Sequence, residues 1–203
     1  MKSILERMET EIIEKKSLFL NYMIPVRNSD QAKEEYLKVK NEHADANHHC
    51  YAYVLGVNQE TQKSFDAGEP NRTAGFPMLE VLLKNDLTDI LTVTVRYYGG
   101  IKLGAGGLVR AYSKSVSEAL KNARFAFLTV YDLVEVIVPF DLIGAVEHFI
   151  RSDYELINTE YNKNVHYFVE IEQEKTKKFA KWVQEQTSGK GTTKTVKTFS
   201  RYK

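Results

Sequence analysis

The residues of this chain that are best suited to chemistry surround a glycine-rich segment near its middle. Five of the nine residues from 99 to 107 are glycine, and the segment follows a β-branched run and precedes a helical pattern. Glycine adopts positive φ angles and lets a ligand approach the backbone, and a helix that starts after such a turn offers free backbone N–H groups to an anion. Arg96, Lys102 and Arg110 bracket the segment. The pattern predicts a site for a phosphate-sized anion, such as a nucleic-acid backbone; the alternative is a tight turn whose glycines serve only packing.

A second group of reactive residue types precedes this segment. The closest approach to a metal-ligand pattern is His43, His48, His49 and Cys50. Zinc sites usually need a second pair of ligands at a recognisable spacing, and the chain has no second cysteine. Strand alternation places His48 and Cys50 on one face together with Ala52 and Val54, which favours a buried strand over a metal site or a histidine-activated thiol. We therefore expect no metal, no cofactor and an unreactive, buried Cys50.

The polar loop at 66–72 carries two carboxylates, Asp66 and Glu69. They could orient a metal or act on a proton beside the basic residues of the glycine-rich segment. They could equally form salt bridges that fix the two loops against each other. The opposite charges of the two loops favour the salt bridges.

Composition describes an ordinary globular protein. The chain has 203 residues, a net charge of +1 and 43% hydrophobic residues, so a nucleic-acid surface would have to be a local patch. One such stretch, 187–203, contains five basic residues and no acid. The single cysteine excludes an internal disulfide and agrees with a reducing compartment. The charged first residues and the lack of an apolar run near 18 residues predict a cytoplasmic protein without a membrane segment.

Hydrophobic periodicity predicts the elements that position these residues. In the first part of the chain we expect extended pieces within 9–26, strands at 50–57 and 90–98, an irregular loop at 64–73, and helices at 30–42, 74–84 and 108–122. Ser29 or Asp30 is the expected cap of the first helix. The β-branched character of 90–98 predicts a strand that is buried on both faces.

The last 70 residues follow a separate pattern. A strand at 133–138, a helix at 141–151, a hairpin of 155–161 with 165–171, a helix at 175–186 and a strand at 192–199 give the order β-α-β-β-α-β, which is ferredoxin-like. We place the domain boundary near Tyr131, with one domain at 1–131 and the other at 132–203.

Three motifs together resemble those of the IMPACT/YigZ family. They are His48-His49-Cys50-Tyr51-Ala52-Tyr53, then Gly68-Glu69-Pro70 with Thr73-Ala74-Gly75, and then residues 96–112 from Arg96-Tyr97-Tyr98-Gly99-Gly100 to Leu108-Val109-Arg110-Ala111-Tyr112. Their order and spacing make the resemblance specific over about 15–125, and the remainder is similar to the small C-terminal domain of bacterial members.

The resemblance implies an α+β protein with an N-terminal domain of the ribosomal protein S5 domain 2-like fold, including its left-handed βαβ crossover. That fold is shared by domain IV of elongation factor G and by small-molecule kinases, and the ferredoxin-like half is similar to domain V of elongation factor G. Eukaryotic relatives regulate translation through an additional N-terminal domain that binds the activator of an initiation-factor kinase. The motifs found here do not include that domain, so that partner is not carried over.

The functional hypothesis is a non-enzymatic cytoplasmic regulator of translation that binds RNA or the ribosome and has a translation-factor partner. The alternative is a small-molecule phosphotransferase or hydrolase that binds a nucleotide phosphate at 99–107, although this segment lacks the Gly-Lys-[Ser/Thr] ending of a Walker motif.

The chain departs from the family pattern at three positions. The family usually has a second Asp where this chain has Ala67, Ser-Gly where it has Asn71-Arg72, and Asn where it has His49. The missing carboxylate argues against a catalytic carboxylate pair, and Arg72 makes the loop more basic. The predicted nucleic-acid or anion site consists of Arg72, Arg96, Lys102, Gly104, Gly106, Gly107 and Arg110.

Overall fold

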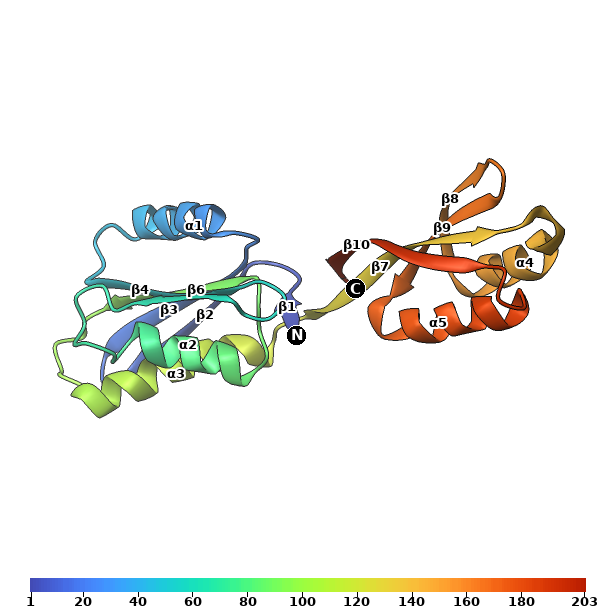
Figure 1. Cartoon of the computed structure of the whole chain (residues 1–203). Coiled ribbons are helices and arrows are strands. Elements are labelled where there is room, and N and C mark those ends of the chain that lie inside the picture. Colours follow the sequence, from blue (N-terminus) through green and yellow to red (C-terminus); the bar gives the residue numbers. More distant parts are fainter. The chain divides into compact units, whose positions relative to one another are not determined.

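The computed structural model describes residues 1–203, the side chain of Ala145 excepted, and the chain forms two compact units (Figure 1). The first unit comprises Met1–Leu128 and Tyr202, and the second comprises Thr129–Arg201 and Lys203. Both units combine helices with a sheet that contains antiparallel strand pairs. These observations confirm the expectation of a two-domain α+β protein.

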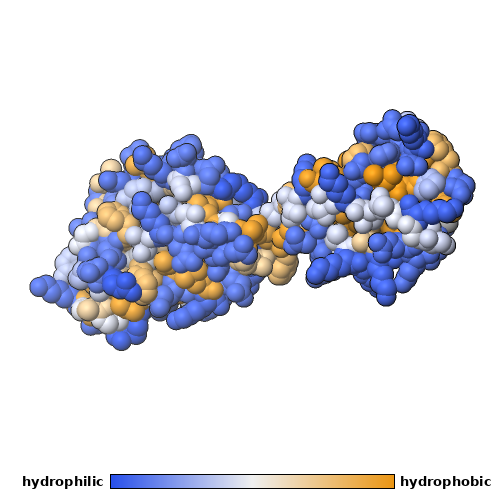
Figure 2. All heavy atoms as spheres, viewed as in Figure 1, coloured by the Kyte–Doolittle hydropathy of each residue, from blue (hydrophilic) through white to orange (hydrophobic). Residues whose placement is uncertain are grey.

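Polar side chains cover most of the visible face of each unit, and apolar side chains reach that face only in small, separate groups (Figure 2). The larger apolar side chains lie in buried clusters inside the units. No helix among the described residues is both long enough and apolar enough to cross a membrane.

A five-stranded antiparallel sheet forms the centre of the first unit. Its strand order is β2 (Met8–Glu14), β3 (Ser17–Pro25), β6 (Ile90–Tyr97), β4 (His48–Leu55) and β5 (Thr61–Phe65). The central strand β6 is buried along all but its last residue, as its β-branched run predicts. A charged side chain within this strand must therefore find a partner inside the unit.

Helices cover both faces of this sheet (Figure 1). Helix α1 (Ser29–Glu42) packs on one face, and α2 (Gly75–Lys84) and α3 (Ala105–Lys121) pack together on the other. The side chain of Asn28, rather than Ser29 or Asp30, caps α1 by accepting the backbone N–H of Gln31 at 2.8 Å.

Three boundaries in the first unit differ from the sequence-based expectation. β5 is a strand that is not expected, and its last two residues overlap the loop expected at 64–73. A short strand β1 (Lys2–Ile4) is also additional. Both are short edge strands held by backbone pairing, β5 to β4 and β1 to β7, so their side chains carry no apolar alternation that would mark them. Helix α3 begins at Ala105 instead of residue 108, which places Gly106 and Gly107 inside its first turn.

The second unit follows the element order β7 (Phe125–Val138), α4 (Ile143–Asp153), β8 (Glu155–Tyr161), β9 (Val165–Glu172), α5 (Gln173–Gln186) and β10 (Thr192–Tyr202), with a short 3-10 turn at Phe140–Leu142. Its strands lie in the order β10-β7-β9-β8. The inward residues of β7 and β9 alternate and pack with α4 and α5 around Ile150 and Phe179. β7 starts earlier than expected because its first residues pair with β1.

Candidate functional site

The loop that carries the two predicted carboxylates is built around Asp66, directly after β5. Its carboxylate accepts backbone N–H groups of Arg72 at 2.8 Å, Ala74 at 3.1 Å and Gly75 at 2.9 Å. The residue at the N-cap of α2, Ala74, cannot supply a side-chain acceptor, and Asp66 satisfies these donors instead. Asp66 therefore has a structural task and makes hydrogen bonds rather than the expected salt bridge.

Glu69, at the other side of this loop, forms a buried ion pair with Arg96 of β6. The Oε1 atom of Glu69 accepts Arg96 Nη1 at 2.6 Å and the Tyr112 hydroxyl of α3 at 2.8 Å, and both charged side chains are only 4–5% exposed. Arg96 Nη2 also donates to Ser17 Oγ at 3.3 Å. The predicted salt bridge between the two loops is present. Arg96 is consequently not a free surface cation, because Glu69 neutralises it.

Cys50 lies on β4 beside this pair. Its Sγ is 3.0 Å from the carbonyl oxygen of Asp66 and 3.3 Å from the Tyr112 hydroxyl oxygen, and the side chain is fully buried. Burial raises the pKa of the Cys50 thiol, and burial likewise raises the pKa of Tyr112. A thiol that stays protonated at neutral pH is a poor nucleophile. The expectation of a buried Cys50 is confirmed.

We predict that native Cys50 resists a bulky disulfide reagent. Because it is the single thiol of the chain, the absorbance of the released aromatic thiolate reports on it alone. We expect negligible release from the folded protein and one equivalent after unfolding in urea. Rapid stoichiometric release from the folded protein would contradict the prediction.

A pocket of about 380 Å³ opens next to the buried ion pair. Its polar lining includes His48, Glu69, Arg96 and Lys102, and its wall is completed by the start of α3 and by apolar side chains. His48 is the register partner of Arg96 in the β4–β6 pairing. This lining combines buried charge with an exposed lysine, which is a suitable arrangement for a small polar anion.

The predicted site residues do not all meet in this pocket. Arg96, Lys102 and Gly104 line it, whereas Gly107 and Arg110 line a neighbouring hollow and Leu103 lies between the two. Gly106 lies in the first turn of α3, where a Cβ would come 3.7 Å from Arg110 Nη1. Arg72 is exposed on the other loop, with its guanidinium 3.6 Å from the ring centre of Phe76.

Two basic residues that sequence reasoning missed adjoin the glycine-rich segment. Lys15 and Lys16 form the exposed turn between β2 and β3, and Gly99 lies directly against the backbone of Lys16. Lys15 shares its hollow with Arg110. The adjacent lysines are visible in the sequence, but only the β3–β6 pairing brings them to this loop.

We refer to Lys15, Lys16, Lys102 and Arg110 as the basic cluster. All four side chains are exposed, and none forms an ion pair with another described residue. Nearby Lys114 differs, since it pairs with Glu14 at 2.7 Å. The described residues hold no group of three or more His, Cys, Asp or Glu side chains arranged for a metal ion.

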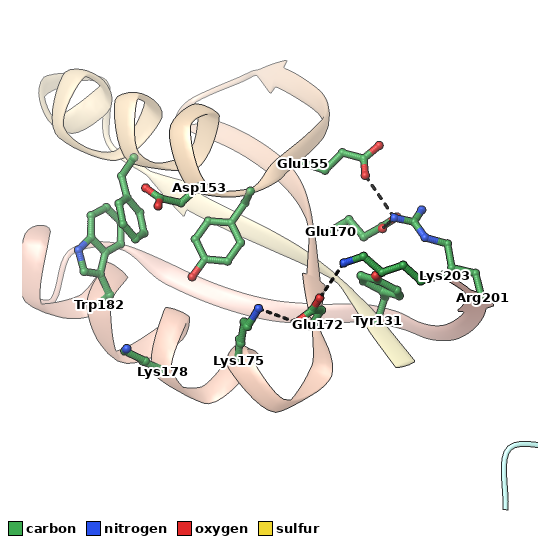
Figure 3. Close-up of a pocket in the computed structure, with 12 residues that line it drawn as sticks. Tyr131, Asp153, Glu155, Glu170, Glu172, Lys175, Lys178, Trp182, Arg201 and Lys203 are labelled. Carbon is green, nitrogen blue, oxygen red and sulfur yellow. Dashed lines mark hydrogen bonds and ion pairs between the residues drawn. The ribbon is translucent and has the colours of Figure 1, made fainter. Parts of the chain in front are cut away.

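Three of the five basic residues in the stretch 187–203 form ion pairs within the second unit. A pocket of about 670 Å³ there is lined by four basic and four acidic residues (Figure 3). Arg201 pairs with Glu155 and Lys203 with Glu172, at 3.4 and 3.3 Å. Lys190 lies 3.7 Å from Asp141. Lys194 and Lys197 are exposed and form no ion pair with another described residue, so the fold pairs part of the predicted basic patch with acids that are distant in sequence.

The fold and the site define a two-domain α+β protein with a polar pocket and a basic cluster at one glycine-rich loop. Residues 15–120 match the family model of the Impact N-terminal domain, and residues 136–190 match that of a domain of unknown function, DUF1949. The chain belongs to the IMPACT family, and the resemblance to its IMPACT/YigZ members is confirmed.

Individual relatives agree with this assignment. The chain is 41% identical to the IMPACT family member YvyE of Bacillus subtilis (strain 168), over 93% of this chain and 87% of the relative. It is 39% identical to YigZ of Escherichia coli (strain K12), over 72% and 74%. A crystal structure described as that of a hypothetical protein superposes with a TM-score of 0.62 at 30% identity, covering 97% of both chains.

Proposed function

We propose that this protein is a non-enzymatic, cytoplasmic regulator of translation that binds RNA or the ribosome through its first domain. The basic cluster carries the proposal. Four exposed cations without ion-pair partners among the described residues adjoin the glycine-rich segment, which ends in a helix start that has no side-chain cap. Such a surface attracts phosphates by charge and offers them backbone N–H groups.

The domain architecture supports the same proposal. We assign domains at 1–131 and 132–203, the first of the ribosomal protein S5 domain 2-like fold and the second ferredoxin-like, similar to domains IV and V of elongation factor G. The second domain follows the element order β-α-β-β-α-β. A translation factor is the protein partner that this architecture favours. The second domain pairs part of its basic residues with acids, whereas the basic cluster of the first domain has no such partners, so we assign the RNA contacts to the first domain.

The test replaces two members of the basic cluster, Lys102 and Arg110, by alanine. Phosphate contacts to single-stranded nucleic acid each contribute about 0.7 to the slope of log affinity against log salt, so the double variant is expected to lose about 1.4 from that slope. Its affinity should fall about equally for different RNA sequences, because phosphate contacts carry no sequence information. Fluorescence anisotropy of labelled single-stranded RNAs at several salt concentrations measures both the affinity and its slope against salt.

Lys40→Ala is the matched control. Lys40 is an exposed lysine of α1, on the sheet face opposite to α3. The Lys40→Ala variant should bind RNA with the wild-type affinity and the wild-type slope of log affinity against log salt. A folded Lys102→Ala/Arg110→Ala variant that also keeps both values would refute the proposed function.

A further inference from the structure

The pocket beside the buried ion pair is lined by two residues with hydrogen-bond acceptors, His48 and Glu69. His48 Nδ1 lies 3.0 Å from the carbonyl oxygen of Ala67. A carbonyl only accepts, so Nδ1–H is the donor, and in the neutral tautomer of this ring Nε2 carries the lone pair. Nε2 lies 3.8 Å from Glu69 Oε1, which is also an acceptor. A hydroxyl group entering the pocket could donate to this pair.

Arg96 balances the charge of Glu69. Its Oε1 already accepts Arg96 Nη1 and the Tyr112 hydroxyl at 2.6 and 2.8 Å. The His48 side chain is 23% exposed, whereas that of Glu69 is 4% exposed. His48 Nε2 is therefore the more accessible acceptor of the two.

The same pocket also offers positive charge and hydrogen-bond donors. Lys102 and the backbone at Gly104 and Ala105, where α3 starts, line it. The first N–H groups of a helix lack intrahelical acceptors and favour an anion. Independently, buried Arg96 lines the pocket, and its Nε–H has no partner among the described residues. A phosphate in the pocket would meet the positive charge of Lys102 and the free Nε–H donor of Arg96, whose own charge Glu69 neutralises.

The size and lining of this pocket suit one nucleotide unit. The pocket measures about 380 Å³ and has apolar walls that include Tyr98, Leu103 and Leu108. A phosphate next to a free hydroxyl is the pattern of a ribonucleotide, and a deoxyribonucleotide within a chain lacks that hydroxyl.

We propose that this pocket binds a ribose phosphate unit of an RNA chain and selects RNA over DNA by accepting the 2′-hydroxyl at His48 Nε2. This inference rests on the proposed function, because it requires that the protein binds RNA. His48 then acts as a specificity-determining residue, and the basic cluster supplies affinity for either nucleic acid.

The test compares a short oligouridylate with an oligodeoxyuridylate of equal length by fluorescence anisotropy. We expect the wild-type protein to bind the RNA about tenfold more tightly, the value of one good hydrogen bond. His48→Asn keeps a donor at the position of Nδ1 but has no group at Nε2, so its RNA affinity should fall about tenfold, to the DNA level. His48→Gln places an amide oxygen or nitrogen near Nε2 and should restore part of the preference.

The outcomes separate this inference from the function on which it rests. A protein that binds neither oligonucleotide refutes both. Equal wild-type binding of RNA and DNA, or a folded His48→Asn variant that keeps the RNA preference, refutes the 2′-hydroxyl contact and leaves RNA binding intact. Melting curves by circular dichroism verify that each variant is folded.

Discussion

Replacing Arg96 by methionine is expected to destabilise the first unit by about 3–5 kcal/mol, the usual cost of leaving one partner of a buried ion pair alone. Methionine retains most of the side-chain length but none of the donors. The Glu69 carboxylate, 4% exposed, would keep the Tyr112 hydroxyl and lose its only cation at hydrogen-bonding distance. Urea unfolding followed by far-UV circular dichroism measures the free energy of unfolding.

The chain offers a matched control with the same chemistry at the surface. Arg124 pairs with Glu6 in the first unit, but their side chains are 70% and 59% exposed. Arg124→Met should therefore cost less than about 1 kcal/mol. If Arg96→Met lowered the free energy of unfolding no more than Arg124→Met, the buried ion pair would not contribute more to the stability of the unit than the exposed one.

An internal probe distinguishes the two units in this experiment. The single tryptophan, Trp182, belongs to the second unit, so its fluorescence transition reports on that unit. Both arginine substitutions lie in the first unit. We expect the midpoint of the Trp182 transition to stay at its wild-type value while the circular dichroism transition shifts for Arg96→Met.

Elements with a strong hydrophobic period could be predicted from the sequence, and polar edge strands could not. The central strand β6 and the helices on the sheet carry apolar patterns that match their burial. β5 has the sequence Thr-Gln-Lys-Ser-Phe and is mostly exposed. This strand forms because β4 presents free backbone groups at that edge of the sheet. Such backbone pairing cannot be predicted from the pattern of side chains.

The candidate site, too, could be predicted from the sequence only in part. Opposite charges on the two loops indicated salt bridges of Asp66 and Glu69 with the basic residues, and the structure forms one of them, between Glu69 and Arg96. A charged residue in a strand that is buried on both faces requires such a partner. The position of His48 beside Arg96 and the approach of Lys16 to Gly99 depend on strand register. Register is defined by tertiary packing, so the sequence named His48 only as a metal or thiol partner and missed Lys16.

Gly99→Ala is expected to destabilise the first unit by about 3 kcal/mol, at the upper end of overpacking effects. A Cβ on Gly99 would lie 2.0 Å from the backbone carbonyl carbon and oxygen of Lys16 and 2.5 Å from the backbone nitrogen of Ser17. These atoms belong to the turn and first residue of β3, which pairs with β6. They cannot move away without weakening that pairing. The same urea unfolding experiment measures the loss.

Gly106→Ala provides the contrast within the same segment. Gly106 is helical, and the nearest neighbour of its added Cβ is the flexible Arg110 side chain at 3.7 Å. Alanine in a helix is favoured over glycine by about 0.5–1 kcal/mol, so this variant should be as stable as the wild type or more stable. Equal stability of Gly99→Ala and Gly106→Ala would contradict the close approach at Gly99. It would mean that the packing of the glycine-rich segment against the Lys16 turn does not contribute to the free energy of unfolding.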